Sequence, residues 1–427
     1  MKKTTLLSQT LPSLKLSPAE QNGIAAEVQA ILAETLRVEH LFIAEKASLD
    51  KRRWKEVKSK DDFRIYKQRK PMKSSTSAVI HRDDFSVSSD DIQAPRFVSV
   101  CESSGSSPRH RSVSSTWSST ASEEEGIVAS IKNPRLPMIV GSGRIEGTIE
   151  DALYGSLAGD EVSWRLRAAY LKDKFADAKI LATIQGPTEE DPYRFLGIKW
   201  FMPERRTGIP ASVINDRDFL VMEAMGVTVD AHGVRHGYYL LHEFIHPDIP
   251  ERQDLKIIRS KLSLCFISRQ VEPRKLHMFA RGFIDPRGDL ILSLAVSRAA
   301  EAMTSTARSV QTSYAKKLAW LMELERQKAN DNWQKHQSAT SPTSCHACEK
   351  PVGLMTSSLL GCQVCHDVFC SKCCVHRNII VAVSTISVTE RLLPFCFACL
   401  LQAKELSPAD VVKDSATSRF KAFSVAP

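Results

Sequence analysis

The sequence has little that would hold the protein in a membrane or direct it out of the cell. Its longest aliphatic run in the C-terminal part, Ile379 to Val383, has five residues, whereas a membrane-spanning helix needs about 20. The segment from Thr4 to Leu16 mixes Thr, Ser, Gln, Pro and Lys, so it lacks the apolar core of about 7 to 15 residues that a secretory signal needs. We therefore expect an intracellular protein in the cytoplasm, with peripheral attachment to endosomal membranes as the membrane-associated alternative.

Charge of one sign is also scarce. The 58 Lys and Arg against 49 Asp and Glu give +9 over 427 residues, which is too small an excess to indicate a nucleic-acid partner, and we expect none. The 43% apolar and 25% charged residues are ordinary for globular proteins and exclude a wholly disordered, collagenous or coiled-coil chain. The length predicts two or three folded units.

Cysteine is nearly absent from most of the chain. Of the eleven cysteines, only Cys101 and Cys265 precede position 345, and the other nine lie between Cys345 and Cys399. In a reducing compartment such a cluster indicates metal ligands rather than a disulfide framework. One short segment is therefore chemically different from the rest.

The first 132 residues contain an ordered part and a polar part. Ser17 and Glu20 flank Pro18 in a capping-box pattern, and apolar residues follow at helical spacing, which predicts a helix over 18–45. Residues 54–69 predict a short hairpin. From 70 to 132 the periodicity is lost, and residues 101–125 hold ten serines, so we interpret 70–132 as a flexible insertion.

The central region predicts an antiparallel meander. Helical spacing occurs over 149–157 and 164–175, and a turn signal at 230–233 joins two strands. In the last strand Met278 and Phe279 lie on opposite faces, and both faces carry apolar residues. The expected strands cover residues 178–184, 193–202, 219–229, 237–245, 261–268 and 275–284.

A single long helix is predicted after this sheet. Residues 285–289 break the last strand and offer Asp289 as an N-cap. An apolar stripe then runs from Ala295 to Leu321, with small residues early and large residues late. Small residues allow a helix to lie close over a curved sheet. Residues 326–344 are polar, and we interpret them as the end of the helix and a linker.

Together these elements resemble the helix-grip architecture of START, the StAR-related lipid-transfer domains. The resemblance rests on the order of elements and on strands such as FLVMEAMGVTV, GYYLLHEFIHP and KLSLCFISRQV. It covers residues 17–325 with 70–132 as an insertion. It implies an α+β fold with a hydrophobic tunnel between the sheet and the C-terminal helix, which holds one lipid or sterol. The same apolar residues also suit a solid core, and the sequence leaves these two alternatives open.

Polar residues of this region suggest no catalytic constellation. The pairs Arg205 with Arg206 and Asp216 with Asp218 suit either a lipid headgroup or solvated loops. Four histidines lie in and after one hairpin without a nucleophile or metal-like spacing: His232, His236, His242 and His246. We therefore expect a protein that is not an enzyme.

The clustered cysteines form four Cys-x-x-Cys pairs, which supply eight thiolates for two tetrahedral zinc ions. Only four residues separate the second and third pairs, so those two cannot easily share an ion. A cross-brace is the expected arrangement. One zinc ion is assigned to Cys345, Cys348, Cys370 and Cys373, and the other to Cys362, Cys365, Cys396 and Cys399. Cys374 remains as a spare thiol or an alternative to Cys373.

The segments CHAC, CQVCHDVFCSKC and FCFAC resemble the FYVE-type zinc finger over residues 345–405, including Phe369 before the fifth ligand. Residues 406–427 form a tail with one short helix after Ser407. The family's basic motif for phosphatidylinositol 3-phosphate is missing around Cys362. With two zinc ions and eight thiolates the module has a net charge near −3, which does not favour an anionic membrane.

Two functional hypotheses follow. The first is lipid binding, transfer or sensing through the START-like domain, combined with a FYVE-related zinc finger. The second is an adaptor whose START-like domain holds no ligand and whose finger binds another protein. In the finger, Met355, Leu359 and Leu360 suit either insertion into a membrane or packing on the zinc core.

Overall fold

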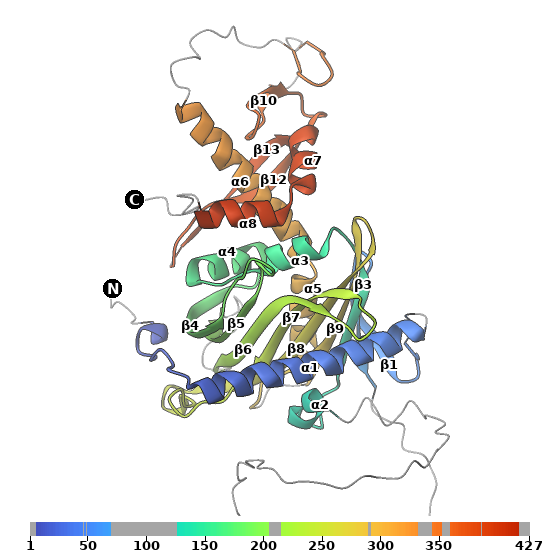
Figure 1. The fold of residues 1–427 in the computed structure, drawn as a ribbon, viewed down its shortest axis with the longest axis vertical. Helices are drawn as coiled ribbons and strands as arrows, with labels where there is room; N and C mark the ends of the chain where they lie inside the picture. Colours follow the sequence, from blue (N-terminus) through green and yellow to red (C-terminus); the bar gives the residue numbers. More distant parts are fainter. Residues whose placement is uncertain are drawn as a thin grey trace, which may run out of the picture.

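The computed structural model describes residues 6–45, 47, 49–69, 126–204, 215–288, 292–331, 344–351, 359–385 and 387–417. Within these ranges a large domain of helices and antiparallel sheet carries a smaller cysteine-rich module, which lies above it in Figure 1. The α+β class predicted from the sequence is confirmed. Most of the predicted insertion, the N-cap Asp289 and the loop pair Arg205 and Arg206 lie outside the described residues.

The first helix, α1 (Pro18–Ala44), begins where the sequence predicts. Both hydrogen bonds of the capping box are present: the side chain of Ser17 accepts from the backbone N–H of Glu20, and the carboxylate of Glu20 accepts from the backbone N–H of Ser17. Figure 1 shows α1 lying across one face of the sheet. A single 3₁₀ turn, η1 (Leu7–Gln9), precedes it.

The sheet has nine strands in the order β1-β2-β3-β9-β8-β7-β6-β5-β4. Its strands from β4 to β9 follow one another as the predicted antiparallel meander, and β1 and β2 form the predicted hairpin. The strands are β1 (Trp54–Lys60), β2 (Phe63–Gln68), β3 (Ile139–Glu146), β4 (Phe175–Gln185), β5 (Phe195–Pro203), β6 (Asp216–Val229), β7 (Arg235–Glu243), β8 (Ile257–Glu272) and β9 (Lys275–Asp285). A 3₁₀ turn, η2 (Gln253–Leu255), precedes β8.

Both faces of this sheet are buried. One face packs with α1, where Ile31 of the helix and Phe279 of β9 share a core. The other face packs with α3 (Ile149–Ser156) and α5 (Leu292–Thr306), where Leu153, Met303 and Met278 share a second core. The strands therefore carry apolar residues on both sides, as the alternation in β9 predicts.

Two short segments differ from the predictions. Helix α2 (Ile127–Ile131) lies inside the predicted flexible insertion, because Val128 is buried and its backbone N–H donates to Glu34 of α1, 3.4 Å away. Helix α4 (Glu161–Leu171) ends earlier than expected, because Lys172 adopts a left-handed conformation with φ 59°. The chain then enters β4 at Phe175.

The predicted single C-terminal helix is in fact two helices. Helix α5 ends at Thr306, and α6 (Ser309–Asp331) begins three residues later. The apolar stripe divides accordingly: Ala299 and Met303 of α5 pack on the sheet, whereas Leu318 and Leu321 of α6 pack with the cysteines. Helix α6 also extends through the first part of the predicted linker. A helix does close over the sheet as predicted, but it ends at Thr306, and α6 carries the apolar stripe on to the cysteines.

The cysteine-rich module consists of short strands, one long hairpin and two helices. Its elements are β10 (Leu360–Gly361), β11 (Val368–Phe369), β12 (Cys374–Val383), β13 (Val388–Cys396), α7 (Phe397–Glu405) and α8 (Pro408–Thr417). The hairpin β12–β13 contacts α4 of the large domain: Leu166, Ile380 and Val383 form a small apolar core. The helix predicted after Ser407 is α8. No described helix is both long and apolar enough to pass through a lipid bilayer.

Candidate functional site

Eight of the nine clustered cysteines form two compact groups. In the first, the Sγ atoms of Cys345, Cys348, Cys370 and Cys373 all lie within 4.8 Å of one another. The Sγ atoms of Cys348 and Cys370 are 3.9 Å apart. The first and third Cys-x-x-Cys pairs therefore meet, as the spacing predicts.

The second group joins the second and fourth pairs at the start of α7. It holds Cys362, Cys365, Cys396 and Cys399, again within 4.8 Å, with the Sγ atoms of Cys365 and Cys396 4.0 Å apart. Cys396 caps α7: its Sγ accepts from the backbone N–H of Cys399, 3.4 Å away. The Sγ of Cys362 accepts from the backbone N–H of Cys396, also at 3.4 Å.

The hairpin between the third and fourth pairs brings these groups together. Strand β12 begins at Cys374 and β13 ends at Cys396, and these two residues face each other in the register. Cys374 itself is buried but belongs to neither group, so Cys373 completes the first group. Neither group of cysteines includes His346, His366 or His376, which are all described residues.

The spacing and the hydrogen bonds of both groups suit a zinc ion. Zinc–sulfur bonds of about 2.3 Å in a tetrahedron place sulfur atoms about 3.8 Å apart. Hydrogen bonds from the backbone N–H of Cys370, against the opposing effect of burial, lower the pKa of the Cys345 thiol to about 6. Burial and a neighbouring thiol raise the pKa of Cys399, so its thiolate needs a cation beside it. Four thiolates around one ion satisfy this requirement.

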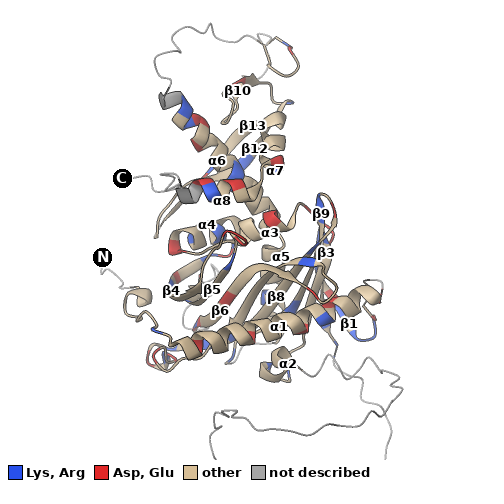
Figure 2. Ribbon diagram, in the orientation of Figure 1, with Lys and Arg blue, Asp and Glu red and all other residues tan. Residues whose placement is uncertain are grey.

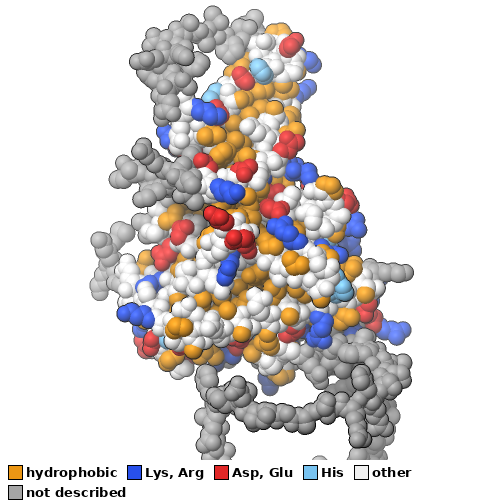
Figure 3. Space-filling view, in the orientation of Figure 1, with side chains coloured by type: hydrophobic (Ala, Val, Ile, Leu, Met, Phe, Trp, Pro, Cys, Tyr) orange, Lys and Arg blue, Asp and Glu red, His pale blue; other side chains and the backbone are white. Residues whose placement is uncertain are grey.

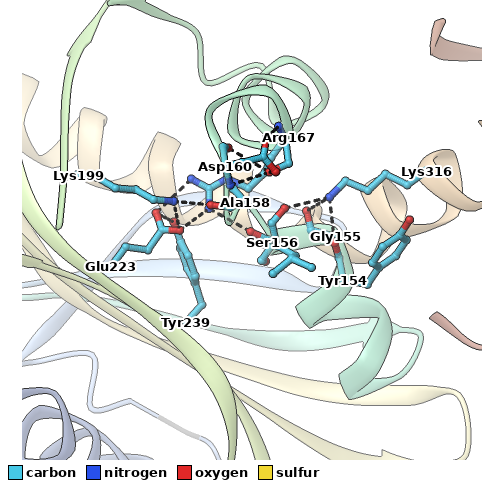
Figure 4. Close-up of polar contacts among 12 residues, drawn as sticks. Tyr154, Gly155, Ser156, Ala158, Asp160, Arg167, Lys199, Glu223, Tyr239 and Lys316 are labelled. Atoms are coloured by element: carbon cyan, nitrogen blue, oxygen red, sulfur yellow. Dashed lines mark hydrogen bonds and ion pairs between the residues drawn. The ribbon is translucent and has the colours of Figure 1, made fainter. Parts of the chain in front are cut away.

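A second concentration of polar groups lies inside the large domain, between the sheet and α4 (Figure 4). Glu223 of β6 accepts from Lys199 of β5 at 2.7 Å and from Arg167 of α4 at 3.2 Å. The hydroxyl of Tyr239 donates to the same carboxylate at 3.2 Å. All four side chains are buried. We call these four residues the ionic cluster.

Backbone carbonyls complete the ionic cluster. Lys199 also donates to the carbonyl oxygen of Ala158 at 2.7 Å, and Arg167 donates to that of Ser156 at 3.0 Å. Burial lowers the pKa of Lys199 to about 8, although the charge of Glu223 opposes this shift. Burial raises the pKa of Glu223, but the charges of Arg167 and Lys199 outweigh it, and the pKa is lowered. The carboxylate is therefore ionised at neutral pH.

Lys316 of α6 extends this polar region (Figure 4). Its Nζ atom donates to the carbonyl oxygens of Tyr154 at 2.9 Å and Leu157 at 3.2 Å, at the C-terminal end of α3. Burial, together with the charge of Arg167, lowers the pKa of Lys316 to about 7. The lysine caps the negative end of the helix dipole.

Two hollows among the described residues are open at the surface. One, of about 400 Å³, lies at the ends of β6, β7 and β8, with apolar walls that include Leu220, Phe244 and Ile249 and with Arg259, Lys261 and Arg287 beside them. The other, of about 330 Å³, lies beside the β1–β2 turn and the end of α5. Each falls within the range of ligand pockets.

Several polar residues that the sequence analysis considered for a functional role have structural roles instead. Asp218 is buried, accepts from the indole N–H of Trp200 at 2.7 Å and pairs with Arg259 at 2.8 Å. It is therefore a structural ion pair rather than a solvated loop charge. His242 is buried, and its Nδ1 atom lies 2.8 Å from the hydroxyl of Ser263. Sequence reasoning missed the ionic cluster, because its members come from four separate elements.

Leu359 and Leu360 of the module are partly buried and pack on the cysteine core. Met355 lies outside the described residues. In Figure 2 the positions of basic and acidic residues are interspersed along the elements of the module. The module therefore lacks the basic motif in its sequence and has charges of both signs along its elements.

The solved structures to which this chain is similar include StAR-related lipid transfer proteins. Human STARD10 matches with a TM-score of 0.34 and 10% identity, covering 68% of this chain and 82% of that chain. Human StAR-related lipid transfer protein 5 matches with a TM-score of 0.34 and 12% identity, over 67% and 96%. The lipid transfer and protein localization domain of human StarD13 matches with a TM-score of 0.33 and 14% identity, over 64% and 95%.

Comparisons of the sequence itself gave no match. No protein-family profile matches the chain, and no curated protein matches it. The fold class rests on the order and pairing of the strands and helices described above: a long antiparallel sheet with α1 on one face and with α3 and α5 on the other. This is the architecture that the START resemblance predicts.

Proposed function

We propose that the chain is a non-enzymatic protein that binds two structural zinc ions through its cysteine module. The proposed ligands are the two groups of four cysteines, and the observation that carries the proposal is their compact arrangement within 4.8 Å. Binding of structural zinc contributes about 10 to 16 kcal/mol to folding. We expect the module, residues 345–405, to unfold when zinc is removed.

Cys362→Ser tests the proposed ligands, with Cys374→Ser as the matched control. Both cysteines are buried in the module, but only Cys362 belongs to a group of four. Elemental analysis of the purified full chain should give the same zinc content for wild type and for Cys374→Ser, and a lower content for Cys362→Ser. A zinc content of Cys362→Ser equal to that of wild type would contradict the assignment.

For the large domain, residues 17–325, we propose binding of one lipid or sterol. The hollow at the ends of β6, β7 and β8 supports this, because about 400 Å³ with apolar walls and with ion pairs at its edge suits an amphipathic molecule. Native mass spectrometry of the full chain purified from cells should detect a co-purifying lipid. A protein that is always empty, and that takes up no lipid from vesicles, would refute the proposal.

A second candidate, an adaptor without a lipid ligand, is supported by the ionic cluster. Buried Arg167, Lys199 and Glu223 occupy space between the sheet and α4 that an apolar ligand cannot share without a desolvation cost. The module would then be the binding surface. Among its described residues, the most exposed large apolar side chains are Leu392 (62%), Phe397 (55%) and Leu401 (54%). Figure 3 shows hydrophobic side chains gathered on the module's near side.

Liposome flotation tests whether the module binds a membrane or, as in the adaptor proposal, another protein. A divergent FYVE-type finger that retained membrane binding would float with vesicles containing phosphatidylinositol 3-phosphate and would place the protein peripherally on endosomal membranes. We expect no phosphoinositide-dependent flotation, because the basic motif is missing. Flotation that required this lipid would overturn the expectation, and Phe397→Ser would then show whether α7 contacts the bilayer.

A further inference from the structure

Outside the cysteine module, two histidines and an aspartate from three elements meet at one carboxylate oxygen. His40 lies near the end of α1, Asp230 follows β6, and His236 lies in β7. The Oδ2 atom of Asp230 is 3.0 Å from Nε2 of His40 and 2.9 Å from Nε2 of His236. These three atoms lie within 4.8 Å of one another. The histidines are 196 positions apart in the chain, so the grouping was not apparent from sequence spacing.

The β6–β7 turn holds the carboxylate of Asp230 in a fixed orientation. Its Oδ1 atom accepts from the backbone N–H of His232 at 2.8 Å and from that of Val234 at 2.9 Å. Gly233 has φ +77°, which favours glycine and lets the turn close. The other oxygen, Oδ2, is thereby directed toward the two imidazoles. A carboxylate anchored through one oxygen is preorganised to bind through the other.

The group of His40, Asp230 and His236 is buried except on the side of His40. The side chains of His236 and Asp230 are 0% and 4% exposed, whereas that of His40 is 35% exposed. The group therefore presents a carboxylate next to two imidazoles, with an opening toward solvent at α1.

A buried carboxylate with its own cationic partner lies beside this group. Glu39 of α1 is buried, its carboxylate lies 3.9 Å from Nε2 of His40, and neither of its oxygens has a hydrogen-bond partner among the described residues. Arg269 and His277 lie 3.6 Å from the same carboxylate. The fixed cation of this region thus pairs with Glu39 and not with Asp230.

We propose that His40, Asp230 and His236 bind one divalent transition-metal ion of the zinc class through Nε2, Oδ2 and Nε2. Two imidazoles and one carboxylate are an established donor set for zinc with an open fourth position. Bonds of about 2.1 Å at angles of about 90 to 109° separate ligand atoms by about 3.0 to 3.4 Å, close to the observed 2.9 and 3.0 Å. The ion would fasten α1 to the β6–β7 turn.

Zinc stoichiometry of the full chain tests this third site. The protein is loaded with Zn²⁺, freed of unbound ion and measured by elemental analysis, beside His40→Gln, Asp230→Asn and the control His246→Gln. His40 is partly exposed, so its replacement should leave the fold intact, which far-UV circular dichroism checks. Wild type and His246→Gln should hold one more zinc ion than His40→Gln and Asp230→Asn.

The readout is a difference, so it does not depend on the cysteine sites. If those sites failed to bind, all four proteins would lose zinc equally and the difference would remain. Equal zinc in wild type and His40→Gln overturns the proposal, because the group is then a hydrogen-bonded triad without an ion. Loading with Co²⁺ gives a second check: the absorption lost in His40→Gln must lack sulfur-to-cobalt charge transfer, and its presence would assign the third ion to cysteines.

Discussion

Replacing Glu223 with glutamine tests whether the ionic cluster is a structural unit of the large domain. The carboxylate of Glu223 is the acceptor for Lys199, Arg167 and Tyr239. Glutamine preserves the volume and one acceptor oxygen, but it removes the negative charge between two buried cations. Breaking a buried ion pair from one side costs about 3 to 5 kcal/mol. We expect a loss of this size in the free energy of unfolding.

The assay is urea denaturation of the zinc-loaded chain, followed by tryptophan fluorescence. Nζ of Lys199 lies 4.7 Å from the ring centre of Trp164, so this indole reports on the cluster. With a slope of about 3 kcal/mol/M, the expected loss lowers the urea midpoint by about 1 to 1.7 M. The matched control is Glu243→Gln, whose partner Lys261 is 32% exposed; such a pair contributes about 0 to 1 kcal/mol.

Two outcomes would refute the reasoning. If Glu223→Gln and Glu243→Gln had equal urea midpoints, the charges of the ionic cluster would not be held in a buried environment, and the reasoning would fail. The double variant Glu223→Gln with Lys199→Met removes one of the two uncompensated cations and should recover part of the loss. If the double variant is as unstable as the sum of the single variants, uncompensated charge is not the cause.

Three further predictions concern the same interfaces. The free energy of unfolding should rise between pH 7 and about 10, because burial lowers the pKa of Lys316 to about 7 and unfolding returns it toward 10.5. In this range the unfolded chain binds more protons than the folded chain, which stabilises the fold as the pH rises. Denaturation measured over this pH range should show a smaller rise for Lys316→Gln. Leu318→Ala, at a side chain only 3% exposed, should cost about 2 to 5 kcal/mol and speed zinc loss to a chelator, whereas Leu401→Ala, 54% exposed, should do neither. Tyr170→Phe removes the acceptor for the backbone N–H of Ile380, 3.0 Å away, and should cost about 1 to 3 kcal/mol, visible as faster proteolysis of the β12–β13 hairpin.

Local signals account for what the sequence predicted well. The capping box at Ser17 and Glu20 involves residues three apart, and each Cys-x-x-Cys pair is a local motif. The strands of the meander alternate over their own length, and both faces of β9 carry the apolar residues that the two cores need. Such features depend on neighbours in the chain, so they can be read without the fold.

Strand β3 was missed because its glycines serve distant contacts. A Cβ atom at Gly141 would lie 2.7 Å from the ring of Phe63, and one at Gly143 would lie 2.3 Å from the carbonyl oxygen of Asp62. The β1–β2 hairpin therefore approaches β3 closely only if these residues lack side chains. The glycines interrupt the apolar alternation from which a strand is predicted.

The break between α5 and α6 has a similar origin. At this point the side chains of Ser305 and Arg308 both donate to the carbonyl oxygen of Leu171, the last residue of α4. Gly155 of α3 admits the start of α6, because a Cβ there would lie 1.8 Å from the carbonyl oxygen of Ser309. These partners are more than 130 positions away in the chain, whereas the apolar stripe continues without interruption. The pattern therefore predicted a single helix.

Helix α6 packs with both folded units, so the cysteine-rich module is part of the large domain's framework. Lys317 is buried, pairs with Asp151 of α3 at 2.8 Å and donates to the carbonyl oxygen of Leu406, just after α7, at 2.9 Å. Leu318, the next residue, packs with the cysteine core. A change in the module that moved α7 would leave the Lys317 ammonium with fewer acceptors in a buried site, at a cost the large domain would share. If the module binds zinc as proposed, we expect zinc binding and the stability of the sheet to be coupled through α6, so that metal loss destabilises both units.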